Sequence, residues 1–373
     1  MGCAVNATTL SRKIIFGYQG WFSTDKADGL GWIHWSRGVP SASTATFDLF
    51  PDVSNYPQAA LSDNTYLTSR ITGRSMELYD SLGVVDVHFS WMQQYGIHGV
   101  AVQRFVVNLV YPNLRERMDQ ILLACRKGAE KYSRVFFVEY DTSGANTDNW
   151  ADLIRADWKR LTTELNVTSS SAYQKEGNKP VLKMFGIGFR NRPGDSSDSL
   201  ELVNHLKSQG VLFIGSVPTF WRDGAGDSKS GYSKVYEAMD VISPWLVGRY
   251  ATSSNFDDLF YGVFLQDLSL TSSRQQGYAP TVFPGFSWTN LQRRKGRSFP
   301  LNQIPRRGGR FWEYQVNAFM NKLFDKNTNT GAYYIFGAMF DGQFSSFLLV
   351  SVLFWFVLFC SVLFCSLVLS HFL

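Results

Sequence analysis

Residues 134–141, RVFFVEYD, decide the fold because they are one member of a series. The stretch is a short β-branched and aromatic run that ends in polar residues, and a longer amphipathic segment follows it. Runs of this kind, ending in polar, Gly or Trp residues, begin at Lys13, Gly99, Arg134, Pro180, Val211, Asp240, Ala279 and Ala332. Parallel strands need a crossover connection, usually a helix, so these eight units predict a parallel (β/α)8 barrel of the TIM type. An open, doubly wound sheet is the alternative.

The segments between the runs predict the helices of this barrel. In residues 114–132, for example, apolar residues recur at helical spacing from Met118 to Cys125. The spacer from Thr24 to Asp86 is rich in Ser, Thr, Asp and Pro, and we interpret it as a long first loop that covers the barrel mouth. Further helices are expected over residues 148–165, 198–209, 232–239 and 311–325.

The chain of 373 residues is predicted to contain three parts. An N-terminal extension (residues 1–12) precedes the barrel (residues 13–341), and a hydrophobic tail (residues 344–373) follows it. Hydrophobic residues make up 45% of the chain and charged residues 18%, which is typical of a globular protein with a sizeable core.

Several classes of site find no support in the sequence. The four cysteines are too few and too poorly spaced for a disulfide framework or a zinc site, and the five histidines form no HxxxH or HxxE pair. Phosphate-binding, dinucleotide-binding and serine-hydrolase motifs are missing. The net charge of +5 includes a basic cluster at residues 293–297, which we interpret as a solvated loop. We therefore expect no metal, no cofactor and no nucleic-acid partner.

Aromatic residues make up 16% of the chain, and many of them stand beside Gly. A barrel carries its site at the carboxyl ends of its strands, where aromatic rings in an open cleft suit the apolar faces of sugars. The alternative is that many of these rings are ordinary core and that His34 is a structural hydrogen-bonding group. The predicted glycan-binding residues are Tyr18, Trp21, Trp32, His34, Trp35, Gln103, Arg104, Tyr140, Trp245, Arg249 and Trp288.

Three carboxylates are candidate catalytic residues. Hydrolysis of a glycosidic bond needs an acid and a second carboxylate that acts as nucleophile or base. Glu139 and Asp141 alternate by two at a strand end and are expected on one face, and Asp341 ends the eighth run. The alternative for Glu139 and Asp141 is an ion pair with Arg104 or Arg249.

A series of segments in fixed order resembles the glycoside hydrolases of families 71 and 99, which include the endo-α-mannosidases. The resemblance covers residues 13–341 and rests on GYQGWF, DGLGWIHW, DLFPDVSNYP, VDVHFSWMQQYGIHGVAVQRF, VEYDTSG, DVISPWLVGRY, VFPGFSWTNL and IPRRGGRFWEYQ. It implies a (β/α)8 barrel, action on a glycan and no metal or redox cofactor. The family's last strand continues as FDExxEGT with a catalytic Glu pair, whereas this chain reads FDGQFS, with Gly342 and Ser345 at those positions. The resemblance therefore implies a chain truncated before its catalytic pair, which is inactive as written or is a carbohydrate-binding pseudoenzyme.

The tail has its own two interpretations. Residues 347–373 contain no Asp, Glu, Lys or Arg, and their length and hydropathy predict a transmembrane helix and a membrane location. A membrane-tethered interaction protein would use this segment as its anchor. The tail consists mainly of Phe, Leu, Val, Cys and Ser, and translation of T-rich noncoding DNA gives the same composition. We favour this second interpretation, in which the tail is a translated intron. The protein would then be soluble, in a compartment that the sequence does not specify.

Overall fold

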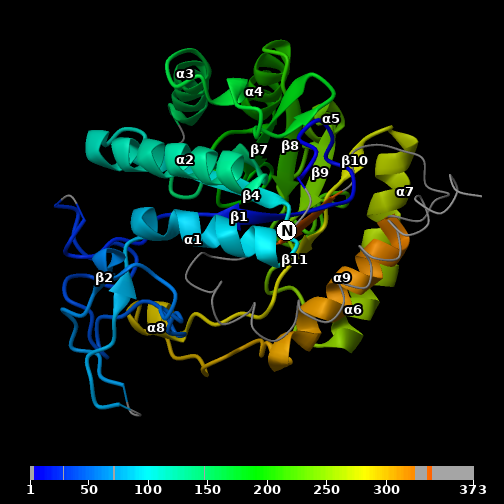
Figure 1. The fold of residues 1–373 in the computed structure, drawn as a ribbon. Helices are drawn as coiled ribbons and strands as arrows, with labels where there is room; N and C mark the ends of the chain where they lie inside the picture. Colours follow the sequence, from blue (N-terminus) through cyan, green and yellow to red (C-terminus); the bar gives the residue numbers. More distant parts are fainter. Residues whose placement is uncertain (1–3, 28, 70–71, 147, 324–333, 338–373) are drawn as a thin grey trace, which may run out of the picture.

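The computed structural model describes residues 4–27, 29–69, 72–146, 148–323 and 334–337. Its centre is a curled sheet of parallel strands with helices around it (Figure 1). The strand order is β10-β9-β8-β7-β5-β4-β1-β12-β11, with β6 paired antiparallel to β7. The strands are β1 (Lys13–Tyr18), β4 (Gly99–Phe105), β5 (Val135–Asp141), β6 (Lys175–Glu176), β7 (Lys179–Phe185), β8 (Leu212–Val217), β9 (Val241–Pro244), β10 (Gly277–Tyr278), β11 (Thr281–Val282) and β12 (Tyr334–Gly337).

Residues 277–282 join the two ends of this curled sheet. β10 pairs with β9, and β11 pairs with β12. Between them, Ala279 N donates to Ile242 O at 2.8 Å, and Phe336 N donates to Pro280 O at 3.0 Å. Pro280 has no N–H to donate, which explains why one stretch of chain is divided into two short strands.

All eight predicted runs contain strands of this sheet, so the predicted TIM-type α/β fold is confirmed as a curled parallel sheet surrounded by helices. The strands are buried on both faces, as β5 shows along its whole length. Such burial explains why the runs are nearly continuous in apolar and aromatic residues, with little of the alternation that a half-exposed strand would show.

The predicted helices correspond to α2, α3, α4, α5 and α9, while α1, the run from α6 to α7 and the short α8 were not predicted. Asp80 caps α1 by accepting a hydrogen bond from Leu82 N at 3.0 Å, so the expected first loop ends before residue 81. The helices are α1 (Ser81–Gln94), α2 (Pro112–Tyr132), α3 (Trp150–Thr163), α4 (Ser196–Ser208), α5 (Ser233–Ala238), α6 (Ser253–Leu259), a π-helical turn (Phe260–Phe264), α7 (Leu265–Ser273), α8 (Thr289–Arg293) and α9 (Arg310–Leu323). Short 3-10 turns occupy Gln58–Ala60, Val106–Asn108, Val167–Ser169 and Arg307–Gly309.

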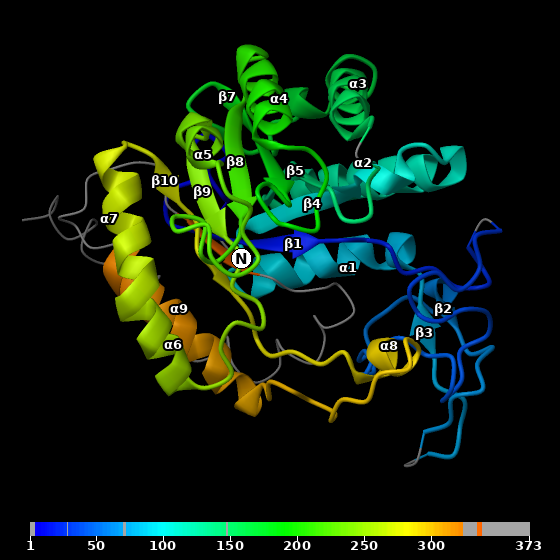
Figure 2. The same cartoon turned by 180° about the vertical axis from the view of Figure 1, so that it is seen from behind.

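The first loop has a small core of its own beside the sheet. It contains an antiparallel pair, β2 (Leu61–Ser62) and β3 (Leu78–Tyr79), and a cluster of buried aromatic residues. Both views show α8 beside this loop (Figures 1 and 2). The side chain of Asp48 joins the two, because it accepts hydrogen bonds from Thr289 N at 2.6 Å and Asn290 N at 2.7 Å.

The prediction of a membrane location needs correction. No helix in the described part of the chain is long and apolar enough to cross a membrane. The predicted anchor, residues 347–373, and the rest of the tail from residue 344 lie outside the described residues, so the structure gives the anchor no support.

Candidate active site

A cavity of about 290 Å³ opens at the carboxyl edge of the sheet. Alternation along each strand turns every second side chain toward it. Gly17 leaves room there, since a Cβ at this position would lie 3.1 Å from the Phe336 ring. The cavity is lined by Gly17, Gln19, Trp21, Gln103, Phe105, Glu139, Asp141, Ser143, Phe185, Trp245 and Phe336.

One wall of the cavity is polar. Asp141 Oδ2 accepts a hydrogen bond from Gln103 Nε2 at 2.6 Å, and Asp141 Oδ1 accepts one from Ser143 N at 2.7 Å. Burial raises the pKa of Asp141, and these two hydrogen bonds oppose the rise. The carboxylate is therefore held in one orientation at the cavity wall.

Glu139 lies beside Asp141 but has a different partner. Its Oε1 atom is 3.0 Å from Lys183 Nζ, and both side chains are buried. Burial raises the pKa of Glu139 and lowers that of Lys183 to about 8, while the attraction between the two charges opposes both shifts. The ammonium group also lies 2.9 Å from the centre of the Phe336 ring. The predicted alternative of an ion pair for Glu139 is thus realised, with Lys183 as the partner instead of Arg104 or Arg249.

The other wall is aromatic. The Trp21 ring stacks on His34, with centroids 3.8 Å apart, and on Phe105, with centroids 4.9 Å apart. Trp245 packs edge to face against Phe185 at 4.9 Å. A flat molecule with apolar faces and polar edges would meet rings on one side and Asp141 on the other.

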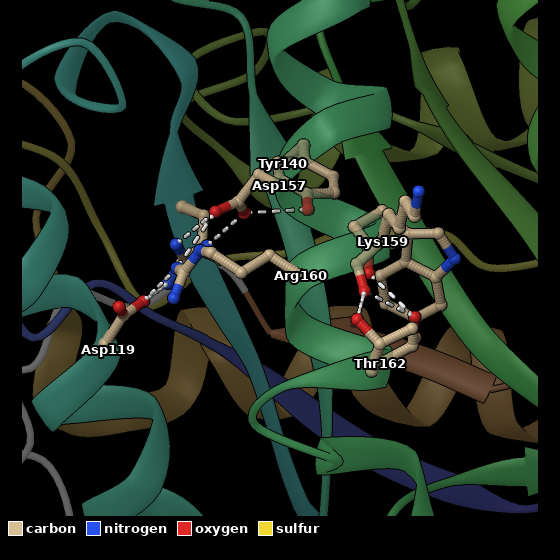
Figure 3. A network of polar contacts seen from close by, with 9 residues as sticks. Asp119, Tyr140, Asp157, Lys159, Arg160 and Thr162 are labelled. Carbon is tan, nitrogen blue, oxygen red and sulfur yellow. Dashed lines mark hydrogen bonds and ion pairs between the residues drawn. The ribbon is translucent and has the colours of Figure 1, made fainter.

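Two predicted site residues point away from the cavity. Arg104 is fully buried and donates to both carboxylate oxygens of Asp157, each at 2.8 Å. The Tyr140 hydroxyl also donates to Asp157, at 2.9 Å. Figure 3 shows this network, which includes Arg160 and Asp119 and lies between the sheet and helices α2 and α3.

The remaining predicted residues are distributed over other parts of the fold. Trp32 and Trp35 are buried in the first-loop cluster, where Trp35 Nε1 donates to Tyr79 O at 2.8 Å. Trp288 directly precedes α8 and packs against Phe286. Arg249 forms an ion pair with Asp227, Tyr18 hydrogen-bonds His88 on α1, and Asp341 lies outside the described residues.

The predicted binding set leaves out several residues of this site, among them Gln19 and Lys183. Gln19 lines the cavity, and its Oε1 atom is buried with no hydrogen-bond partner among the described residues. Lys183 pairs with Glu139 across neighbouring strands. Period-two alternation on β7, with Phe185 facing the cavity, could have identified Lys183 as an inward-facing charge. In the same described part of the chain, no group of three or more His, Cys, Asp or Glu residues could hold a metal ion.

No protein-family model and no curated protein sequence matches the chain. Two solved structures of a family 99 endo-α-mannosidase from Bacteroides thetaiotaomicron are similar to it. One is 13% identical and has a TM-score of 0.56, covering 87% of this chain and 83% of that protein. The other, in complex with bis-tris-propane, is 14% identical and has a TM-score of 0.55, covering 87% and 82%. The chain therefore has the fold of the family 99 glycoside hydrolases, as its sequence segments predict.

Proposed function

We propose that the cavity at the carboxyl edge binds a carbohydrate and that the protein is glycoside-hydrolase-like. The observation that carries this proposal is the pairing of stacked rings with polar groups in one cavity. The Trp21 and Trp245 rings line the cavity and offer apolar surface to a sugar ring, while Asp141 and the unpaired Oε1 atom of Gln19 offer acceptors to its hydroxyls. The endo-α-mannosidase activity named for the structural neighbours favours an α-linked mannoside.

The proposed architecture is a complete (β/α)8 barrel over residues 13–341. Residues 277–282 would supply its seventh strand, because their two halves bond to β9 and β12. Such a barrel surrounds the cavity with loops from all its strands. The N-terminal residues 1–12 would remain an extension outside the barrel.

The sugar-binding role is tested by the variant Trp21→Ala. Loss of this ring from the cavity wall should weaken binding of an α-linked manno-oligosaccharide about tenfold, measured by calorimetric titration. Tyr261→Ala, which removes a ring that is 69% exposed on the π-helical turn, is the control and should leave the affinity within twofold. A folded wild-type sample that binds none of a panel of oligosaccharides would refute the proposal.

We further propose that the chain as written hydrolyses glycosides poorly and acts as a binding protein. Glu139 is engaged by Lys183, and Asp141 is engaged by Gln103 and Ser143. Gly342 and Ser345 stand where the resembled family has its Glu pair. Loss of a general acid or base costs a factor of about 10²–10⁴ in rate.

The double variant Gly342→Glu/Ser345→Glu tests this second proposal. It should hydrolyse α-linked manno-oligosaccharides at least about 100-fold faster than the unmodified chain, measured by product release. Equal binding by the two proteins is the internal control. If the unmodified chain already turns over as fast as the double variant, the proposal of inactivity fails and Glu139 and Asp141 become the candidate catalytic pair.

A further inference from the structure

Arg192 lies beside Phe185 of the cavity wall, although nothing in the sequence pattern singles it out. Its guanidinium carbon is 5.5 Å from the centre of the cavity-lining Phe185 ring. Its positive charge acts on Asp141, where it opposes the rise in pKa that burial causes. The side chain therefore belongs to the electrostatic surroundings of the cavity.

The guanidinium group of Arg192 has unused hydrogen-bonding capacity. NH1 donates to Asn191 O at 3.2 Å, whereas Nε is buried without a hydrogen-bond partner among the described residues. Within the same residues Arg192 forms no ion pair, and the Asp141 oxygens already accept from Gln103 and Ser143. Burial lowers the pKa of Arg192. Only the charge of Asp141 opposes this lowering, so the guanidinium keeps N–H donors for an oxyanion, for which its planar fork is suited.

The backbone holds Arg192 in this position. Lys229 Nζ donates to Arg192 O at 2.8 Å and also to Gly194 O, which fixes the turn that carries the side chain. Gly186 follows β7 with φ of +112°, and a Cβ there would overlap Thr142 Oγ1 and lie 3.2 Å from Arg192 Cγ. The glycine leaves space for Thr142 and for the arginine stem at the end of β7, so the guanidinium is pre-organised beside Phe185.

The loop that follows β11 also carries positive charge near the cavity. Residues 283–309 follow β11 and contain six Lys or Arg residues and no Asp or Glu. β11 runs parallel to the other strands of the sheet, so this loop starts at the carboxyl edge where the cavity opens. A loop whose charges are all positive attracts anionic ligands toward the carboxyl edge of the sheet.

We propose that the carbohydrate carries an oxyanion and that Arg192 binds it. This inference rests on the proposed sugar-binding function and adds the class of sugar: an α-linked oligosaccharide with a carboxylate, phosphate or sulfate group. Asp141 and Gln19 contact hydroxyls of the same ligand, and the 283–309 loop raises its association rate.

The test measures affinities by calorimetric titration for the full chain, at 50 and 500 mM NaCl. The probes are a neutral α-manno-oligosaccharide, a phosphorylated one, a sulfated one and an α-linked oligogalacturonide, which together separate phosphate, sulfate and carboxylate. Arg192→Met removes the charge, and Arg192→Lys retains it without the fork. Arg12→Met removes the same charge from an exposed residue just before β1, at the opposite edge of the sheet.

Wild-type protein should bind at least one anionic probe about tenfold more tightly than the neutral one, with a preference that shrinks at high salt. Arg192→Met should abolish that preference while neutral binding stays within threefold, Arg192→Lys should retain part of it, and Arg12→Met should retain all of it. Equal affinity for neutral and anionic probes, or a preference that survives in a folded Arg192→Met protein, overturns the inference and leaves the proposed sugar binding intact. Failure of every probe to bind overturns both.

Discussion

Strands β4 and β5 carry two sets of polar residues that alternate along the chain. Gln103, Glu139 and Asp141 face the cavity, whereas Arg104 and Tyr140, each one residue away, face α2 and α3. The same two strands thus serve a binding site on one side and helix packing on the other. A residue type at a strand end consequently says little about function until its face is known.

The two faces also differ in how fully their polar groups are paired. Asp157 accepts two hydrogen bonds from Arg104 and one from Tyr140, and Arg160 adds an ion pair at 3.2 Å. On the cavity side, Gln19 keeps a buried acceptor without a partner among the described residues. A satisfied buried network stabilises one arrangement of the fold, while an unsatisfied group is available to a ligand.

Arg104→Met should produce the largest effect on stability. The variant removes a fully buried guanidinium and leaves Asp157 as a buried carboxylate with reduced compensation. Breaking a buried ion pair in this way costs about 3–5 kcal/mol. Guanidinium denaturation should show this loss in the free energy of unfolding, with sugar affinity within twofold of wild type while the protein is folded.

Arg155→Met is the matched control for Arg104→Met. Arg155 pairs with Asp152 at 2.8 Å and Glu201 at 2.9 Å on the protein surface, where both acids are largely exposed. Such pairs contribute at most about 1 kcal/mol. If the two variants lost similar stability, the outer network would not be the stabilising element that its burial indicates.

Much of the fold could be predicted from the sequence because the strands of the eight runs are buried on both faces over most of their length. Eight apolar runs separated by helix-length spacers are a strong signal, and every run contains a strand. The stretch from α6 to α7 was missed because its Ser, Asn and Thr residues have low helix propensity and a π-helical turn interrupts its period. Packing of its Phe residues against α9 supplies the stability that local propensity lacks.

The site was predictable only in part, for a geometric reason. Of the predicted site residues, Trp21, Gln103, Glu139, Asp141 and Trp245 line the cavity. The sequence places other candidates near strand ends but does not give the face on which each side chain emerges. The first loop also limited the prediction of the site. Its tryptophans pack into a separate core, and no periodic pattern in the sequence indicates that core.

His88→Gln should have the next largest effect, seen as a change in acid stability. His88 is buried behind β1 between two tyrosines, with Nδ1 2.9 Å from the Tyr18 hydroxyl and Nε2 2.7 Å from that of Tyr56. Burial lowers its pKa from 6.5 to about 3. Between these values the unfolded chain binds a proton that the folded protein does not, so stability falls as the pH falls through this window.

Glutamine keeps a donor and an acceptor for the two tyrosines but does not titrate. The drop in unfolding free energy between pH 6.5 and 4 should therefore be about 3 kcal/mol smaller in His88→Gln than in wild type, at about 1.4 kcal/mol per pH unit. His205→Gln, at an exposed position of α4, should leave the drop unchanged. Equal acid sensitivity of His88→Gln and wild type would show that His88 is not held neutral by the fold.

Asp141→Asn should have the smallest effect, and it should appear in binding instead of stability. Asparagine keeps an oxygen acceptor for Gln103 or Ser143, and burial already disfavours the charged form of Asp141. The free energy of unfolding should stay within about 1 kcal/mol of wild type, because a neutral side chain avoids the cost of burying a charge. Affinity for the α-linked oligosaccharide should fall about tenfold, because a sugar hydroxyl donates a stronger hydrogen bond to a carboxylate than to an amide.

The control is Asp157→Asn, the same change on α3 behind β5. It should show the reverse result, with a clear loss of stability and an affinity within twofold of wild type. Loss of affinity in Asp157→Asn with none in Asp141→Asn would invert the assignment of the two faces of β5.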